Sequence, residues 1–219
     1  RSLPPVHDSA AEQRGEQAWT ELGSGFKPSW RHEWRIEAPV GLVRHRLDVS
    51  WFPKASEGQR ASGQLAIDSP GFVRIAADPG KITDGHGHEL QAAWQQQRFG
   101  RHVVEIDFGR QLPPNQAFRL TAQSTLQPTT GLSMDGDAYS FHMPMRAVRG
   151  GATGHRVSLP RRTRIDVVSP TPTERFATAD GRQVLMWCLP DDAHRTVAAT
   201  VRFRFDGMLT EAWPAPDRV

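Results

Sequence analysis

Apolar and polar residues alternate along much of the chain after Trp34. Successive side chains of a strand point to opposite faces of a sheet, so this period of two indicates strands with one buried and one solvated face. Regular alternation covers residues 43–51, 104–108, 118–122, 139–143 and 197–205, and less regular alternation covers residues 64–67, 72–76, 165–168 and 183–189. The pattern predicts about nine strands.

Turn residues separate these strand candidates, and helical signals are confined to the front of the chain. Clusters of Pro, Gly, Asp and Asn lie at residues 69–71, 78–80 and 112–115. Ser9 stands three residues before Glu12 in a capping-box arrangement, which predicts one short helix over about residues 9–20, weakened by Gly15. Short strands without intervening helices predict an all-β fold: an antiparallel β-sandwich or jelly roll with one short N-terminal helix.

The predicted domain organisation has three parts: an N-terminal tether with the short helix (1–25), a β-sandwich domain (26–210) and a C-terminal tether (211–219). Prolines at both ends of the chain resist regular structure. Three glycines mark a sub-boundary at residues 150–154. The chain begins at Arg1 with no leader-like segment, so we expect a piece excised from a larger protein.

Composition excludes several classes of protein. No apolar run approaches the roughly 20 residues of a membrane-spanning helix, and Cys188 has no second cysteine with which to form a disulfide. Lys and Arg number 27 against 24 Asp and Glu, and because acids interrupt the basic residues almost everywhere, the charge pattern argues against nucleic-acid binding.

One basic cluster leaves a polyanion-binding domain open as an alternative function. Arg161, Arg162 and Arg164 follow each other closely, and alternation places Arg202 and Arg204 on one face of their strand. These five side chains would form an arginine stripe if the two segments pair as strands.

His86 and His88 are the candidate metal ligands. Two histidines at i and i+2 of an extended segment point to one face, where they can form the first pair of ligands of a divalent metal. Together with Gly80 and Gly100, their spacing resembles the first motif of the cupin family, which implies a cupin-like metal-dependent enzyme. The family's glutamate ligand would fall at position 92 or 93, where this chain has alanine, so Glu89, His102 or His142 would complete the site.

The leading hypothesis is a non-enzymatic binding or protein-interaction module. No complete catalytic motif occurs in the sequence, and seven tryptophans accompany a single tyrosine. Tryptophan is enriched at binding hot spots. Trp30, Trp34 and Trp94 are the candidate contacts for a protein or carbohydrate partner, although packing of Trp34 in the core is the competing interpretation. His45 is expected to be a hydrogen-bonded core histidine, and His142 is expected to face solvent.

Overall fold

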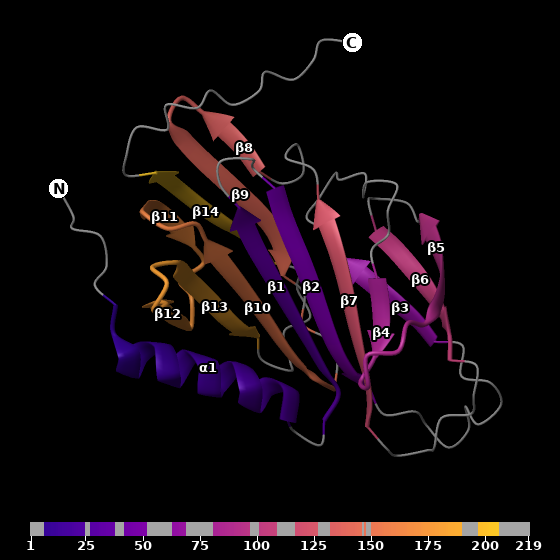
Figure 1. The fold of residues 1–219 in the computed structure, drawn as a ribbon. Helices are drawn as coiled ribbons and strands as arrows, with labels where there is room; N and C mark the ends of the chain where they lie inside the picture. The colour runs from indigo at the N-terminus through magenta and orange to yellow at the C-terminus, as the bar shows by residue number, and fades with distance from the viewer. Residues whose placement is uncertain are drawn as a thin grey trace, which may run out of the picture.

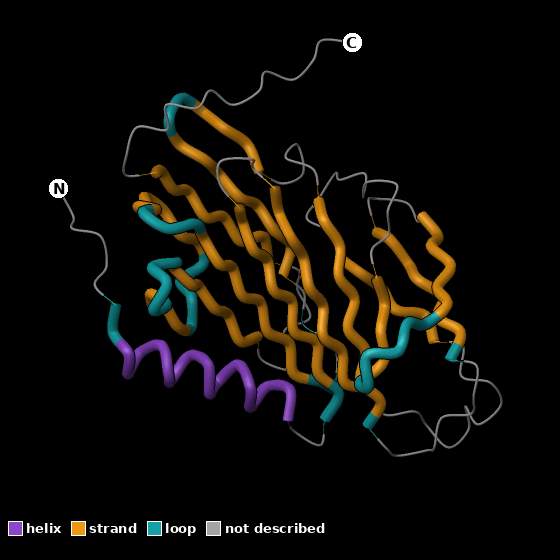
Figure 2. The backbone as a smooth tube through the Cα atoms, in the orientation of Figure 1, coloured by secondary structure: helices purple, strands orange, loops and turns teal. Residues whose placement is uncertain are grey.

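A computed structural model describes residues 7–24, 27–37, 42–51, 63–68, 81–96, 101–108, 117–126, 132–145, 147, 150–189 and 197–205. It contains one helix and, in the described part, fourteen strands arranged in three sheets (Figures 1 and 2). The predicted all-β fold with one N-terminal helix is confirmed. Within the described residues no helix has the length and apolar character that a membrane crossing requires, in agreement with the sequence.

The largest sheet has seven strands. Their spatial order is β12 (Glu174–Ala177), β13 (Gln183–Leu189), β10 (Ala152–Leu159), β1 (Ser29–Glu37), β2 (Leu42–Trp51), β7 (Phe118–Leu126) and β4 (Lys81–Asp84). All neighbours in this sheet are antiparallel except β1 and β10, which run parallel. The sheet is therefore mixed, which corrects the prediction of a purely antiparallel fold.

Two smaller antiparallel sheets complete the fold. The four-stranded sheet has the order β11 (Thr163–Ser169), β14 (Val197–Phe205), β9 (Ala138–Met145) and β8 (Leu132–Asp135). The three-stranded sheet has the order β3 (Gly63–Asp68), β6 (Arg101–Asp107) and β5 (Gln91–Gln96). Figure 1 shows them beside different ends of the large sheet.

The smaller sheets pack against one face of the large sheet, called here the inner face. The first core cluster joins large-sheet residues such as Trp34, Val157 and Leu185 to side chains of the four-stranded sheet, among them Phe141, Met143, Val201 and Phe203. The second core cluster joins β2, β4 and β7 to Ile106 and Phe108, at the end of the three-stranded sheet. Burial of these apolar side chains supplies the main favourable free energy of the fold.

The helix α1 (Ser9–Ser24) packs on the opposite, outer face of the large sheet. Gly154 of β10 lies against Trp19 and Leu22, and Arg156 is bonded to Glu16. The capping residue is Asp8 rather than the predicted Ser9, because the Asp8 carboxylate accepts hydrogen bonds from the backbone N–H groups of residues 10 and 11. Those N–H groups lack partners within the helix.

Six of the fourteen strands were not predicted: β1, β4, β5, β8, β10 and β12. In β10 the alternation is masked because side chains are buried on both faces of the strand, with Gly154 in its centre. Residues 152–154 of the predicted sub-boundary lie within β10, which pairs with β1. The strand predicted at 72–76 and the C-terminal tether at 211–219 lie outside the described residues.

Candidate functional site

His86 and His88 lie in an exposed turn after β4. Their ring centroids are 6.1 Å apart, and the backbone N–H groups of both residues donate to Asp84 Oδ1 at 2.8 and 2.9 Å. The His88 ring bonds to the other carboxylate oxygen. These bonds lower the pKa of Asp84 to about 2, against the opposing effect of burial. The Asp84 carboxylate therefore holds the turn at residues 84–88 together through these hydrogen bonds.

Glu89 and His142, the other candidate ligands with described side chains, do not complete a metal site with this pair. Glu89 forms an ion pair with Lys81 at 3.4 Å, and His102 belongs to β6, with its side chain outside the description. His142 faces solvent as predicted and bonds to Thr200. Among the described residues no group of three potential ligands could hold a metal ion, so the cupin-like hypothesis gains no geometric support.

The three tryptophans do not form one surface in the described structure. Trp34 is buried, with 1% of its surface exposed, which removes it from the predicted contact set. Trp30 is half-buried against the second core cluster, and Trp94 belongs to β5 with its side chain outside the description. The indole of Trp34 is drawn into the core because its strand is covered by the four-stranded sheet.

The predicted arginine stripe forms but is neutralised. Strands β11 and β14 pair, which brings Arg164 opposite Arg204 on the solvated face. Arg204 binds both Asp137 and Asp166, Arg164 also pairs with Asp166, and Arg202 pairs with Asp135. Arg161 lies within 3.7 Å of Asp180, while Arg162 occupies the turn before β11. Three carboxylates thus balance the three strand arginines, which weakens attraction for a polyanion.

Three buried histidines form a cluster on the inner face of the large sheet, called here the histidine stack: His32 of β1, His45 of β2 and His155 of β10. His32 and His155 are register partners, and their rings are nearly parallel with centroids 4.6 Å apart. His32 Nδ1 and His45 Nε2 are 3.2 Å apart, which is a hydrogen bond. Trp34 stacks on His45 at 3.8 Å. The expectation of a hydrogen-bonded core His45 is confirmed.

The histidine stack is neutral and incompletely hydrogen-bonded. Neither ring nitrogen of His155, nor Nε1 of Trp34, has a hydrogen-bond partner among the described residues. Desolvation lowers the pKa of His32 to about 4 and holds the pKa values of His45 and His155 well below 6.5. Electrostatic repulsion by His32 lowers the pKa values of His45 and His155 further.

The outer face of β1, β2 and β7 carries a second group of arginines that the sequence analysis missed. This basic face consists of Arg31, Arg35, Arg44, Arg46 and Arg119, interspersed with Glu33, Glu37 and Asp48. Arg31 and Arg46 both approach Asp48, and Arg35 pairs with Glu37. Arg44 and Arg119 are exposed and form no ion pair with any described residue.

Residues 30–36 contain a sequence signal for both the histidine stack and the basic face. Trp30, His32, Trp34 and Ile36 alternate with charged residues, so the segment has the strand period if histidine is counted as a buried residue. What the alternation could not supply was the neighbouring strand, because β10 is about 120 residues further along the chain.

No protein-family model and no curated protein matches this chain. Among solved structures it is similar to an M1 zinc metallopeptidase from Deinococcus radiodurans, with 13% identity, a TM-score of 0.46 and coverage of 81% of this chain and 41% of that one. It is also similar to native yeast LTA4 hydrolase, with 12% identity, a TM-score of 0.48 and coverage of 80% and 28%. The chain therefore spans less than half the length of either protein.

Proposed function

We propose that this chain is a non-enzymatic protein-interaction module that binds an acidic segment of a partner protein through the basic face. The observation that supports this is a pair of exposed arginines, Arg44 and Arg119, that form no ion pair with the described residues. They lie on β2 and β7, beyond the strands that contact α1 on the outer face. Guanidinium groups pair with carboxylates in a planar, two-point geometry. Acidic side chains are thus the complementary chemistry.

The mixed charge of the face favours a protein over a nucleic acid. Glu33, Glu37 and Asp48 alternate with the arginines across β1 and β2. A continuous phosphate backbone would meet these carboxylates and be repelled, whereas a protein segment can place acidic and basic or neutral side chains in turn. The same consideration applies to the polyanion alternative at the arginine stripe, whose strand arginines are already paired.

A labelled ten-residue peptide of alternating glutamate and serine provides the probe for this function, because it presents acidic and neutral side chains in turn. We expect the purified chain to bind it at low salt and to lose at least tenfold in affinity, about 1.4 kcal/mol, when Arg44→Glu and Arg119→Glu are combined. Binding should also weaken as the salt concentration rises, since both side chains are exposed.

The matched control is the pair Arg161→Glu and Arg162→Glu, which makes the same change in net charge at exposed positions outside the basic face. This variant should bind the peptide nearly as well as the unaltered chain. Equal losses in the two variants would show that only net charge matters and would contradict the proposal, as would equal binding of the Arg44/Arg119 variant and the unaltered chain.

A further inference from the structure

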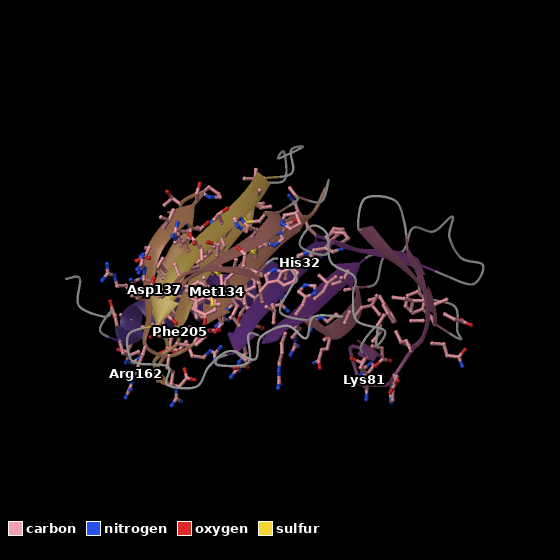
Figure 3. All side chains as sticks on the ribbon, turned by 90° about the horizontal axis from the view of Figure 1, so that it is seen from above. His32, Lys81, Met134, Asp137, Arg162 and Phe205 are labelled. Atoms are coloured by element: carbon pink, nitrogen blue, oxygen red, sulfur yellow. The ribbon has the colours of Figure 1, made fainter. Side chains whose placement is uncertain are left out.

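The histidine stack lies where the two core clusters meet. On β1, Trp34 belongs to the first core cluster and Trp30 packs against the second, and His32 lies between them in the strand. Figure 3, seen from above, places His32 in the middle of the molecule, between the four-stranded and three-stranded sheets. The three rings thus connect β1, β2 and β10 between the two core clusters.

The ring geometry favours protons over metal ions as the species that the stack can take up. The lone pairs of imidazole lie in the ring plane, and the planes of His32 and His155 differ by only 3° while their centroids are 4.6 Å apart. The lone pairs of two parallel, stacked rings lie in two separate planes and do not point to a common position. The two rings therefore cannot bind the same metal ion in this arrangement. His45 is inclined by only 14° to His32 and is already hydrogen-bonded to it.

We propose that the histidine stack is an acid-sensitive lock that keeps β1, β2 and β10 packed while all three rings are neutral and opens when the chain takes up protons. A charge on one ring would lie beside two other imidazoles in a water-excluded site. Burial of an uncompensated charge is costly, so protonation favours states in which the stack reaches water.

No counter-ion offsets such a charge among the described inner-face residues. The neighbours on β10, β13 and β9 are Thr153, Val157, Trp187 and Phe141, which carry no charge. Among the described residues, two other titratable groups are buried on the core side of the sheets: Asp84 on β4 and Tyr139 on β9. Asp84 lies on the edge strand β4 with its carboxylate bound to the turn at His86 and His88. Tyr139 stacks on Phe203, and burial raises its pKa, which keeps it neutral.

The direction of the pH effect follows from the lowered pKa values. Above pH 6.5 the rings are neutral in both the folded and unfolded chain, so the stack contributes its full packing. Below 6.5 the unfolded chain takes up protons that the folded chain refuses, and stability falls until the folded pKa is reached. For His32, with a folded pKa of about 4, this interval corresponds to about a 300-fold rise in the unfolding equilibrium constant.

Urea unfolding between pH 7.5 and pH 5 tests the proposal, with His155→Phe as the variant. Phenylalanine keeps a stackable ring, and the His155 ring forms no hydrogen bond with any described residue. In the unaltered chain we expect the unfolding equilibrium constant to rise by more than tenfold for each unit by which the pH falls below 6.5. A slope of that size means that unfolding is coupled to the uptake of more than one proton. In His155→Phe the rise should be less steep by about one proton. The exposed control, His142→Gln, should keep the original slope.

Three outcomes would overturn the proposal. One is an equal slope in His155→Phe and the unaltered chain. Another is a rise in the urea midpoint on adding equimolar Zn²⁺ that occurs in the unaltered chain and not in His155→Phe, which would make the stack a metal site. The third outcome is protonation of any of the three rings at pH 6 in the folded chain. NMR ring signals measure it, and we expect them to remain those of neutral imidazole. This measurement needs no variant, so it decides the matter even if His155→Phe does not fold.

The lock does not rest on the proposed function, although the two share strands. Strands β1 and β2 carry the basic face on their outer side and the histidine stack on their inner side. Opening of the histidine stack would therefore also disturb the basic face. The unfolding measurements contain no peptide, so they can fail or succeed separately from the binding measurements.

Discussion

His32 and His155 occupy facing positions of the parallel strands β1 and β10, and their rings stack at 4.6 Å with planes 3° apart. This contact joins the beginning of the β-structure to a strand about 120 residues later. It lies in the only parallel pairing among the described strands, at the centre of the large sheet. Substitutions near this contact, and at the contacts of α1 with the sheet, should change the stability of the chain in predictable directions.

Trp34→Ala should destabilise the chain by about 3–5 kcal/mol, because it removes a large buried side chain and leaves a cavity beside His45. Urea unfolding at pH 7.5 measures the change. Met134→Ala is the control, since Met134 is 52% exposed and its truncation should change the free energy of unfolding by less than about 0.5 kcal/mol. Equal, small effects at both positions would place Trp34 at the surface.

Gly15→Ala should destabilise the chain, although alanine is ordinarily favoured over glycine within a helix by about 1 kcal/mol. A Cβ at position 15 would overlap the ring of Phe176, which is buried on β12. Helix α1 would have to move away from the sheet. Thermal unfolding should show a lower melting temperature for Gly15→Ala.

Gly23→Ala provides the comparison for this prediction. The three atoms nearest to a Cβ at position 23 belong to the guanidinium end of Arg31, which is the far end of a flexible side chain rather than a buried ring. This variant should be neutral or slightly stabilising. A higher melting temperature in Gly15→Ala than in Gly23→Ala would contradict the close packing of Gly15 on Phe176.

Arg182→Lys should cost about 1–3 kcal/mol despite keeping the positive charge. The Arg182 guanidinium donates to Ser158 Oγ, to the Glu37 carboxylate and to the backbone carbonyl of Ile36, at 3.0, 3.3 and 2.6 Å. A lysine ammonium cannot span three acceptors on two strands. Arg161→Lys, at an exposed position whose ion pair in the described part of the chain is with Asp180, should change the unfolding free energy little, and urea unfolding compares the two. Similar values for both variants would be inconsistent with the bridging role.

Asp84→Asn should loosen the turn at residues 84–88 at pH 7. The carboxylate accepts two backbone hydrogen bonds there, and its pKa of about 2 keeps it ionised. Its contribution is complete above pH 3.8, the ordinary value, and is lost as the pH falls toward 2. Hydrogen exchange of the His86 and His88 amides should accelerate in Asp84→Asn and not in Glu89→Gln. Unchanged protection would show that the backbone alone holds the turn.

The sequence by itself determined the class of the fold and much of its one-sided patterning. Alternation at residues 43–51 places His45 inside and Arg44 outside, and the structure agrees, because the pleat of a strand fixes which side chains share a face. The same rule placed Arg202 and Arg204 together on the solvated face.

Only the tertiary structure decided what each face meets. Period-two alternation states that His32 shares a face with Trp34, yet it does not name the strand beside them, and the partner of His32 is on β10. It also could not show that Asp135, Asp137 and Asp166 neutralise the arginine stripe while Arg44 and Arg119 stay unpaired among the described residues. Local sequence sets the direction of a side chain, whereas pairing between distant strands sets its neighbours, and the neighbours decide burial, charge and pKa.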